Sequence, residues 1–244
     1  MLDIQHLVKS YGHVVAVNDL NLTIADGDIF GFIGANGAGK TTTLKAVVGI
    51  HGFDKGDILV NGASIRTDPI GVKQQLAYVP DNPDVYEFLT GIKYLNFVAD
   101  VFGVSPTDRA TRIEKYASGL ELSSDLPSQV ASYSHGMKQK LVMIGALIHA
   151  PRLLVLDEPF VGLDPKAAFT LKEYFKDITD AGGSIFFSTH GLEVAQKLCN
   201  KIAIIQKGVL LEVGPTEEIV GKQSLEEVFL ELTNDDQVPG ADRR

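Results

Sequence analysis

The stretch "IFGFIGANGAGKTT", residues 29–42, decides the fold of this chain. An apolar run at 29–33 leads into a loop with three glycines, and a helical pattern follows to about residue 49. Residues 34–41 fit the spacing G-x-x-x-x-G-K-[ST]. A strand, a glycine-rich loop and a helix in this order predict a loop whose backbone N–H groups surround a chain of phosphates. A glycine-rich turn without a ligand is the weaker alternative.

Each residue type of this loop suits a nucleotide and its metal ion. The Lys40 ammonium can reach the β- and γ-phosphates of ATP, and the Thr41 hydroxyl can bind Mg²⁺. The helix that follows adds the positive end of its dipole. We therefore predict ATP and Mg²⁺ as cofactors. The expected contacts are Gly34, Asn36, Gly37, Ala38, Gly39, Lys40, Thr41 and Thr42.

A second motif, "RLLVLDEP" at 152–159, supplies the other half of a nucleotide site. A continuous apolar run predicts a parallel strand buried on both faces. Its last residue, Asp157, would lie at the carboxyl edge of the sheet, where ligands of open α/β sheets bind. Asp157 can hold Mg²⁺ through water, and Glu158 can polarise an attacking water. Taken alone, this motif is explained equally well by a turn of acidic residues. The phosphate-binding loop (P-loop) predicted at residues 34–41 favours the nucleotide site.

Strands and helices alternate after this second motif. A helical stretch at 167–180 is followed by a strand at 184–190, a helix at 191–199 and a strand at 201–206. This alternation predicts an α/β fold with a mostly parallel sheet. The segment from about 84 to 148 reads as mostly helical, and we expect it to be an inserted helical subdomain.

The N-terminal residues predict a different kind of sheet. Asp26–Gly27 and Asn61–Gly62 stand between β-like runs, and such pairs are typical of hairpin turns. We therefore expect an antiparallel β layer over about 2–28 and 57–66. The last residues, 233–244, are polar and predict a flexible tail.

Composition narrows the classes of function. A chain of 244 residues is long enough for one sizeable domain, and its net charge of −9 argues against nucleic-acid binding through a basic surface. One cysteine, Cys199, cannot form an internal disulfide, which fits a reducing cytoplasm. No signal peptide is recognisable, and apolar runs such as 141–148 are far below the roughly 18 residues of a bilayer span. We expect a soluble protein that reaches a membrane only through a partner.

The stretch "YSHGMKQK", residues 133–140, predicts an unusual helix start. Ser134 suits the N-cap, but a glycine in the first turn lowers stability, and lysines near the positive end of a helix oppose its dipole. A flexible capped start is the simple interpretation. The alternative interpretation is that the glycine leaves the backbone N–H groups of this helix start accessible to an acidic ligand.

These motifs, in this order, resemble the ATP-binding-cassette (ABC) ATPases over about residues 2–232. "YSHGMKQ" stands at the family signature "LSGGQ", and "GLDP" at 162–165 matches the D-loop. Tyr11 in "YG" matches the aromatic residue that stacks on adenine, and His190 in "STH" matches the switch histidine. The resemblance implies a single domain with a P-loop NTPase (RecA-like) core, an N-terminal antiparallel β subdomain and the inserted α-helical subdomain.

The resemblance also implies roles for these residues. Lys40, Glu158 and His190 would take part in ATP hydrolysis, while Thr41 and Asp157 would hold Mg²⁺. In an ATP-dependent head-to-tail homodimer, the signature of one chain would contact the nucleotide bound to the other chain. The residues expected to act in this way are Ser134, His135 and Gly136.

Two positions depart from the family pattern. Asp81 follows "YVP" where the family has glutamine; its oxygen can still reach Mg²⁺ and the nucleotide, although a turn-forming aspartate explains it as well. His135 replaces a signature glycine. We expect its side chain either to point away from the phosphates or to add a donor near the ribose or the γ-phosphate.

The partner follows from a closer resemblance. "YVPDNPDVYEFLT", "EPFVGLDP" and "EVFLELTNDD" are most similar to the ATP-binding subunits of Ecs-type transporters of Gram-positive bacteria, which are treated as exporter-like. This implies a peripheral protein on the cytoplasmic face of the cell membrane, bound to an integral membrane subunit and not to nucleic acid. A soluble ABC ATPase and a low-turnover regulatory cassette are the alternatives. Candidates for the membrane-subunit contact are Val85, Tyr86, Phe88 and Leu89.

Overall fold

The computed structural model describes residues 1–83 and 85–234. Its core is a six-stranded sheet in the order β10-β9-β3-β8-β7-β6. All neighbouring strands pair in parallel except β10, which runs antiparallel to β9. The predicted α/β fold with a mostly parallel sheet is therefore confirmed. The strands are β3 (Ile29–Ile33), β6 (Leu76–Val79), β7 (Leu153–Asp157), β8 (Ser184–Thr189), β9 (Lys201–Gln206) and β10 (Val209–Pro215).

A second, antiparallel sheet has the order β2-β1-β4-β5. Asn61 and Gly62 join β4 to β5 with φ of 49° and 80°, the left-handed conformation of a type I′ hairpin turn, as predicted. The strands are β1 (Leu2–Tyr11), β2 (Val14–Ile24), β4 (Lys55–Val60) and β5 (Ala63–Ser64).

The hairpin predicted at Asp26–Gly27 is wrong. This turn carries the chain from β2 in the antiparallel sheet to β3 in the parallel sheet, and the Gly27 N–H donates to the carbonyl of Gly183 at 3.0 Å. An Asp-Gly pair predicts that the chain changes direction at this point, but it does not predict which strand the next segment pairs with. The β3 strand is apolar and nearly fully buried, so it pairs with β8 and β9 and not with β2.

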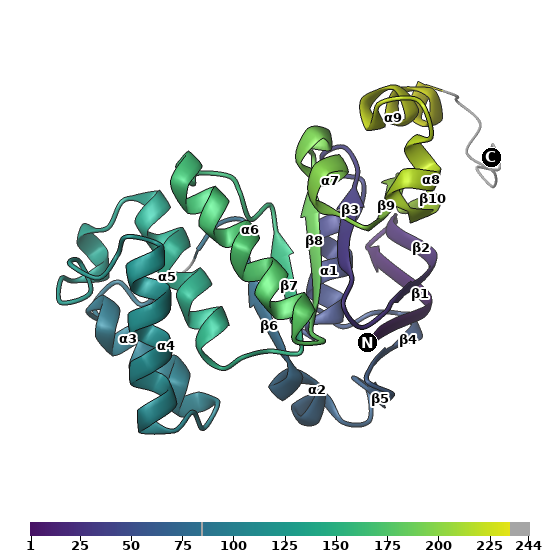
Figure 1. Ribbon diagram of the computed structural model, residues 1–244. Coiled ribbons are helices and arrows are strands. Elements are labelled where there is room, and N and C mark those ends of the chain that lie inside the picture. Colours follow the sequence, from purple (N-terminus) through teal and green to yellow (C-terminus); the bar gives the residue numbers. More distant parts are fainter. Residues whose placement is uncertain (84, 235–244) are drawn as a thin grey trace.

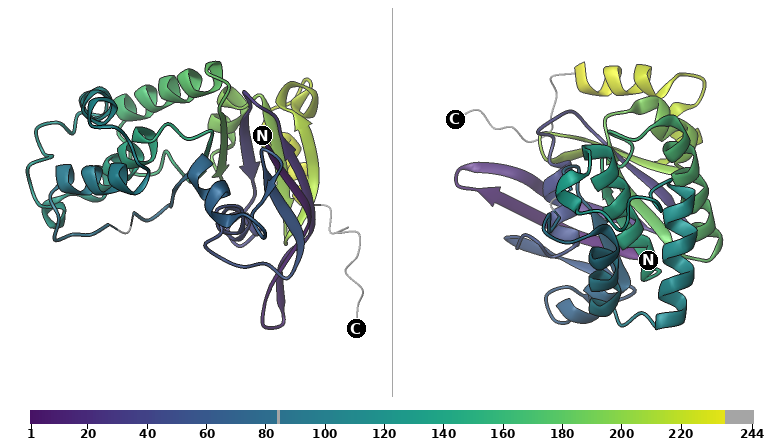
Figure 2. Two further views of the ribbon diagram at one scale, coloured as in Figure 1. Left: turned by 90° about the horizontal axis from the view of Figure 1, so that it is seen from below. Right: turned by 90° about the vertical axis from the view of Figure 1, so that its left-hand side faces the viewer.

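Helices surround the parallel sheet. Figure 1 shows α3, α4 and α5 at one end of the molecule, α6 between them and the sheet, and the antiparallel sheet toward the other end; Figure 2 shows the same arrangement from two further sides. The helices are α1 (Lys40–Val47), α2 (Pro69–Gln75), α3 (Gly91–Val101), α4 (Pro106–Gly119), α5 (His135–Ile148), α6 (Pro165–Asp180), α7 (Leu192–Leu198), α8 (Thr216–Val220) and α9 (Leu225–Asn234).

The ends of two expected segments fall outside the described residues. The expected helical segment begins at residue 84, which the structure does not describe. The expected tail begins at residue 233; Thr233 and Asn234 end α9, and residues 235–244 are not described. Within the described ranges, no helix is both long enough and apolar enough to cross a membrane.

The parallel sheet is buried on both faces. Phe186 packs toward the antiparallel sheet, with ring centroids 5.9 Å from Phe30 and 5.5 Å from Phe32. Its neighbours Ile185 and Phe187 belong to the opposite cluster, beneath the helices. This alternation along β8 explains why β-branched and aromatic residues form an uninterrupted run there.

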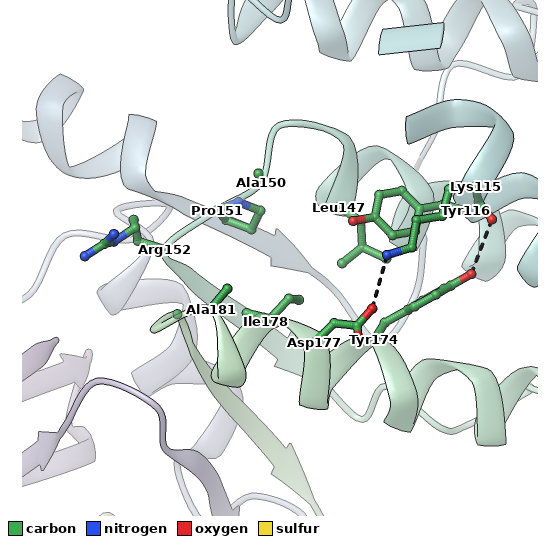
Figure 3. A pocket seen from close by; sticks show the side chains of 11 residues that line it. Lys115, Tyr116, Leu147, Ala150, Pro151, Arg152, Tyr174, Asp177, Ile178 and Ala181 are labelled. Carbon is green, nitrogen blue, oxygen red and sulfur yellow. Dashed lines mark hydrogen bonds and ion pairs between the residues drawn. The ribbon is translucent and has the colours of Figure 1, made fainter. Parts of the chain in front are cut away.

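A cavity of about 280 Å³ lies between α4 and α6 (Figure 3). Lys115 pairs with Asp177 at 3.1 Å, and the Tyr174 hydroxyl donates to the carbonyl of Lys115 at 3.3 Å. The lining also includes Pro151 and Arg152, just before β7, so this cavity lies at the amino edge of the sheet. The P-loop leaves the opposite, carboxyl edge. This cavity is therefore separate from the expected nucleotide site.

Removal of a ring from the sheet core should destabilise the protein. Phe186 is fully buried, and we expect Phe186→Ala to lower the free energy of unfolding by about 3–5 kcal/mol, because both the apolar contacts and the filled volume are lost. Urea unfolding measures this change. The matched control is Phe169→Ala, at a side chain 64% exposed on α6, which should shift stability by about 0.5 kcal/mol or less. Equal losses in the two variants would contradict this account of the core.

Candidate nucleotide site

The glycine-rich loop joins β3 to α1, and at Gly34 and Gly39 it is packed too tightly for a side chain. A methyl group built on Gly34 would lie 2.5 Å from the carbonyl oxygen of Ile205, and one on Gly39 would lie 2.5 Å from that of Ala16. Gly39 also has φ of 110°, which side-chain-bearing residues rarely adopt. Gly34 and Gly39 are therefore required by the neighbouring strands as well as by the predicted ligand.

Lys40 begins α1 and folds back over this loop. Its ammonium donates to the carbonyls of Gly34 at 2.7 Å and Ala35 at 3.2 Å, and the residue is 7% exposed. Burial lowers the pKa of Lys40, and the negative charges of Glu158 and Asp157 oppose this shift. A nearly buried ammonium that faces this loop is well placed to pair with phosphate oxygens.

A cavity of about 200 Å³ opens between the loop and the carboxyl edge of the sheet. The structure brings together here the two acidic residues of the second motif and the predicted loop residues except Gly34, which is not part of the described lining. The lining consists of Ala16, Asn36, Gly37, Ala38, Gly39, Lys40, Thr41, Thr42, Asp81, Asp157 and Glu158.

Asp157 is 1% exposed at the end of β7 and accepts two hydrogen bonds. One comes from the Thr41 hydroxyl at 2.7 Å, and the other comes from the Ser188 hydroxyl. A carboxylate and a hydroxyl oxygen side by side form the kind of donor set that Mg²⁺ takes together with phosphates and waters. The residues therefore fit the predicted metal. Sequence reasoning missed Ser188, although a serine in the buried run "SIFFST" was a signal.

Glu158 is held in a conformation that is unusual for its residue type. Its φ is 49°, and its N–H donates to the carbonyl and to the hydroxyl of Ser188, both at 3.2 Å. His190 follows β8, and its Nδ1 lies 2.9 Å from Glu158 Oε1. Left-handed backbone at a non-glycine residue costs about 1–3 kcal/mol and persists where the surrounding structure enforces it. The structure thus brings the two predicted residues into direct contact.

Asp81 follows β6 and lines the cavity. Its Oδ1 also accepts the N–H of Asn82 at 2.8 Å, so it stabilises its own turn. The two interpretations of Asp81 from sequence, a site residue and a turn former, are therefore compatible. Asp81 and Asp157 both raise the pKa of the Tyr78 hydroxyl, after burial as the main cause, which places negative charge close to this ring.

Tyr11 lies at the end of β1, and the described lining of the cavity does not include it. Its hydroxyl is 2.8 Å from His51 Nδ1, and its ring remains 45% exposed. Lys9 Nζ lies 4.9 Å from the ring centroid. The hydrogen bond to His51, a residue that sequence reasoning missed, holds the Tyr11 ring in this orientation.

The signature residues lie outside the cavity that the described part of this chain forms around the P-loop. Ser134 caps α5 and accepts the N–H of Met137 at 3.3 Å, as predicted. A methyl group on Gly136 would lie 2.8 Å from the carbonyl oxygen of Gly162 in the D-loop. The close carbonyl oxygen of Gly162 is therefore a second reason for a glycine at position 136, and the sequence alone did not reveal it.

The lysines of the signature helix have acidic partners that offset the unfavourable helix dipole. Lys138 pairs with Glu87, and Lys140 pairs with Asp164 at 2.7 Å.

Comparisons with known proteins agree with this geometry. A family model described as "ABC transporter" matches residues 17–161. The ABC-type transporter ATP-binding protein EcsA of Bacillus subtilis (strain 168) is 32% identical, over 97% of this chain and 98% of that protein.

Two solved structures share the fold. One, described as the ATP-binding subunit of an ABC transporter, has a TM-score of 0.92 at 32% identity and covers 96% of this chain and 99% of its own. The other, a dimeric post-hydrolysis state of the ATP-binding cassette MJ0796 bound to ADP and Pi, has a TM-score of 0.81 at 19% identity and covers 88% and 99%. With the P-loop, Asp157, Glu158 and His190 in place, the chain belongs to the ABC transporter family, as an ATP-binding and ATP-hydrolysing subunit.

Proposed function

We propose that this chain binds ATP with Mg²⁺ in the P-loop cavity and hydrolyses it with Glu158 to drive a separate membrane-spanning exporter. The observation that carries the proposal is the convergence of Lys40, Thr41, Asp157 and Glu158 on one cavity of about 200 Å³. Residues 2–232 would act as one domain, with 84–148 as its inserted helical part. Export is proposed on the Ecs-type resemblance of the motifs.

The loop residues would bind the phosphates. Backbone N–H groups at the start of α1 and the Lys40 ammonium supply the positive charge for the β- and γ-phosphates. Thr41, Asp157 and Asp81 would hold Mg²⁺, which when bound neutralises charge that develops on the phosphates. Tyr11 presents an exposed ring face for adenine, and His51 keeps that ring in place.

Glu158 would orient and deprotonate the attacking water. Its carboxylate lines the cavity and is 16% exposed, so it is within reach of a water there and little screened by solvent. His190 holds this carboxylate through Nδ1, and it is 64% exposed, which leaves the rest of its ring accessible to the γ-phosphate. Together they would activate water only when a nucleotide fills the cavity.

A second copy of the chain would complete the site. Ser134 and His135 are exposed at the start of α5, outside their own chain's P-loop cavity. A helix N-terminus with Gly136 in its first turn offers unpaired N–H groups to an anion. Ser134 and Gly136 would therefore contact the γ-phosphate of the partner chain's ATP in a head-to-tail homodimer, with His135 between them.

A membrane-spanning subunit would bind near α3. Tyr86 packs against Phe88 in a tilted arrangement and against Phe97 edge to face, with centroid distances of 5.9 Å and 5.8 Å, and the three residues are 52%, 74% and 45% exposed. Such a cluster on a water-facing surface is typical of a protein interface. Of the residues expected from sequence, Val85 is an incorrect choice because it is 8% exposed and packs in the core. The chain would thus act on the cytoplasmic face of the membrane.

Replacement of the proposed base tests hydrolysis. We expect Glu158→Gln to reduce ATP turnover by about 10²–10³-fold while ATP still binds, because the amide cannot accept the proton. A phosphate-release assay and nucleotide-binding fluorescence measure the two effects. The matched control is Glu193→Gln, at an exposed glutamate on α7 that pairs with Lys197, and it should retain wild-type turnover. Wild-type turnover in Glu158→Gln would refute the proposal.

Dimerisation should depend on bound ATP. Glu158→Gln with ATP should migrate as a dimer in size-exclusion chromatography with light scattering, because unhydrolysed nucleotide holds the two chains together. With ADP the same variant should be monomeric. Addition of Ser134→Arg should abolish the dimer, since a bulky side chain blocks the anion site. A dimer that survives Ser134→Arg would show that another surface joins the chains.

The exposed aromatic cluster should bind the membrane subunit. We expect Phe88→Ser to reduce recovery of a multi-span membrane protein at least tenfold when the tagged chain is purified from detergent-solubilised membranes of its native cells. ATP turnover of the isolated chain should be unchanged, because Phe88 does not line the described P-loop cavity. The control is Phe169→Ser, at another exposed ring. Equal recovery in both variants would contradict this assignment.

A further inference from the structure

The ring of His135 packs on the D-loop of its own chain. A methyl group built on Gly162 would lie 3.1 Å from His135 Cδ2 and 3.6 Å from Nε2, so the imidazole covers the bare α-carbon of this glycine. The neighbouring Gly136 meets the carbonyl oxygen of the same residue, 2.8 Å from where a methyl group would stand. The start of α5 and Gly162 therefore interlock through two adjacent residues.

A second contact holds the other end of this loop. Lys140, one turn further along α5, pairs with Asp164 at 2.7 Å, and its side chain is only 13% exposed. Asp164 also caps α6 by accepting the N–H of Ala167 at 2.8 Å. The hydrogen bond from Lys140 lowers the pKa of Asp164 to about 2, so this carboxylate stays charged across the physiological range.

The same loop carries Glu158. The Val161 N–H donates to the carbonyl of Glu158 at 3.1 Å, and the Leu163 N–H donates to that of Phe160 at 3.4 Å, so residues 158–164 form consecutive turns. Glu158 itself has φ of 49°. A loop that begins with a strained residue keeps its conformation only while neighbouring groups hold it.

We propose that His135 is a positioning residue, whose ring packs on Gly162 and holds the loop 158–164, and with it Glu158, in place for hydrolysis. The inference rests on the proposed role of Glu158. It assigns His135 a function within its own chain, through packing and not through a hydrogen bond to phosphate. A flat ring can cover Gly162, whereas a glycine at position 135 leaves that α-carbon uncovered.

Loop order can be measured without any nucleotide. The chain contains no tryptophan, and Val161 is 49% exposed on this loop, so Val161→Trp supplies a single tryptophan there, whose emission can be excited selectively over that of the tyrosines. In this background we expect His135→Gly to lower the fluorescence anisotropy of the tryptophan, and His135→Phe to retain it. The control is His6→Gly, at a histidine 75% exposed on β1 with φ of 49°, which should change nothing. Equal anisotropy in the glycine, phenylalanine and parent proteins would overturn the inference.

Steady-state kinetics test the consequence. We expect His135→Gly to lower kcat five- to tenfold with KM for ATP within twofold, and His135→Phe to restore kcat, with equal thermal unfolding midpoints for both. Failure of His135→Phe to restore kcat would show that a ring nitrogen acts directly and would overturn the packing role. Unchanged kcat in His135→Gly, beside a loss in Glu158→Gln, would refute this inference alone. Retained turnover in Glu158→Gln would instead refute the proposed function.

Discussion

The buried carboxylate of Asp157 is the constraint on which the site depends. Transfer of a charge into a protein interior costs several kcal/mol unless hydrogen bonds compensate, and Asp157 is 1% exposed. Its two donors, Thr41 and Ser188, come from α1 and β8, so they fix the P-loop helix and two strands to one another. Ser188 also receives the N–H of Glu158. One acidic side chain thereby sets the relative positions of the phosphate loop and the proposed base.

Contiguous motifs could be predicted from sequence, and contacts between distant segments could not. The stretch at 34–42 and the buried strand before Asp157 carry their structure locally, through glycine spacing and apolar character. The partners Ser188 and His51 are ordinary residues until the fold places them beside Asp157 and Tyr11. The Asp26–Gly27 turn shows the same limit: its chemistry indicates a reversal, but the pairing of β3 is decided by burial on both faces.

Two separate contacts favour glycine at position 136. The sequence indicated a backbone kept bare for an acidic ligand, and the structure adds the carbonyl oxygen of Gly162 on its other side. Any side chain at this position would disturb the D-loop before it met a phosphate. The lysines that seemed out of place at this helix start pair with Glu87 and Asp164, so the positive charge is already matched within the chain.

The position of β3 in the sheet has a consequence for synthesis of the chain on the ribosome. Ile29 pairs with Ile185, and Phe30 pairs with Lys201, so the strand that carries the P-loop emerges long before either neighbour. The antiparallel sheet is complete by Ser64 and can form early, whereas "IFGFI" stays exposed as an apolar, unpaired strand. Nascent chains that stall before β8 would expose this unpaired apolar segment, which favours aggregation. The nucleotide site, whose P-loop precedes β8 and β9 in the chain, is therefore among the last parts of the fold to be completed.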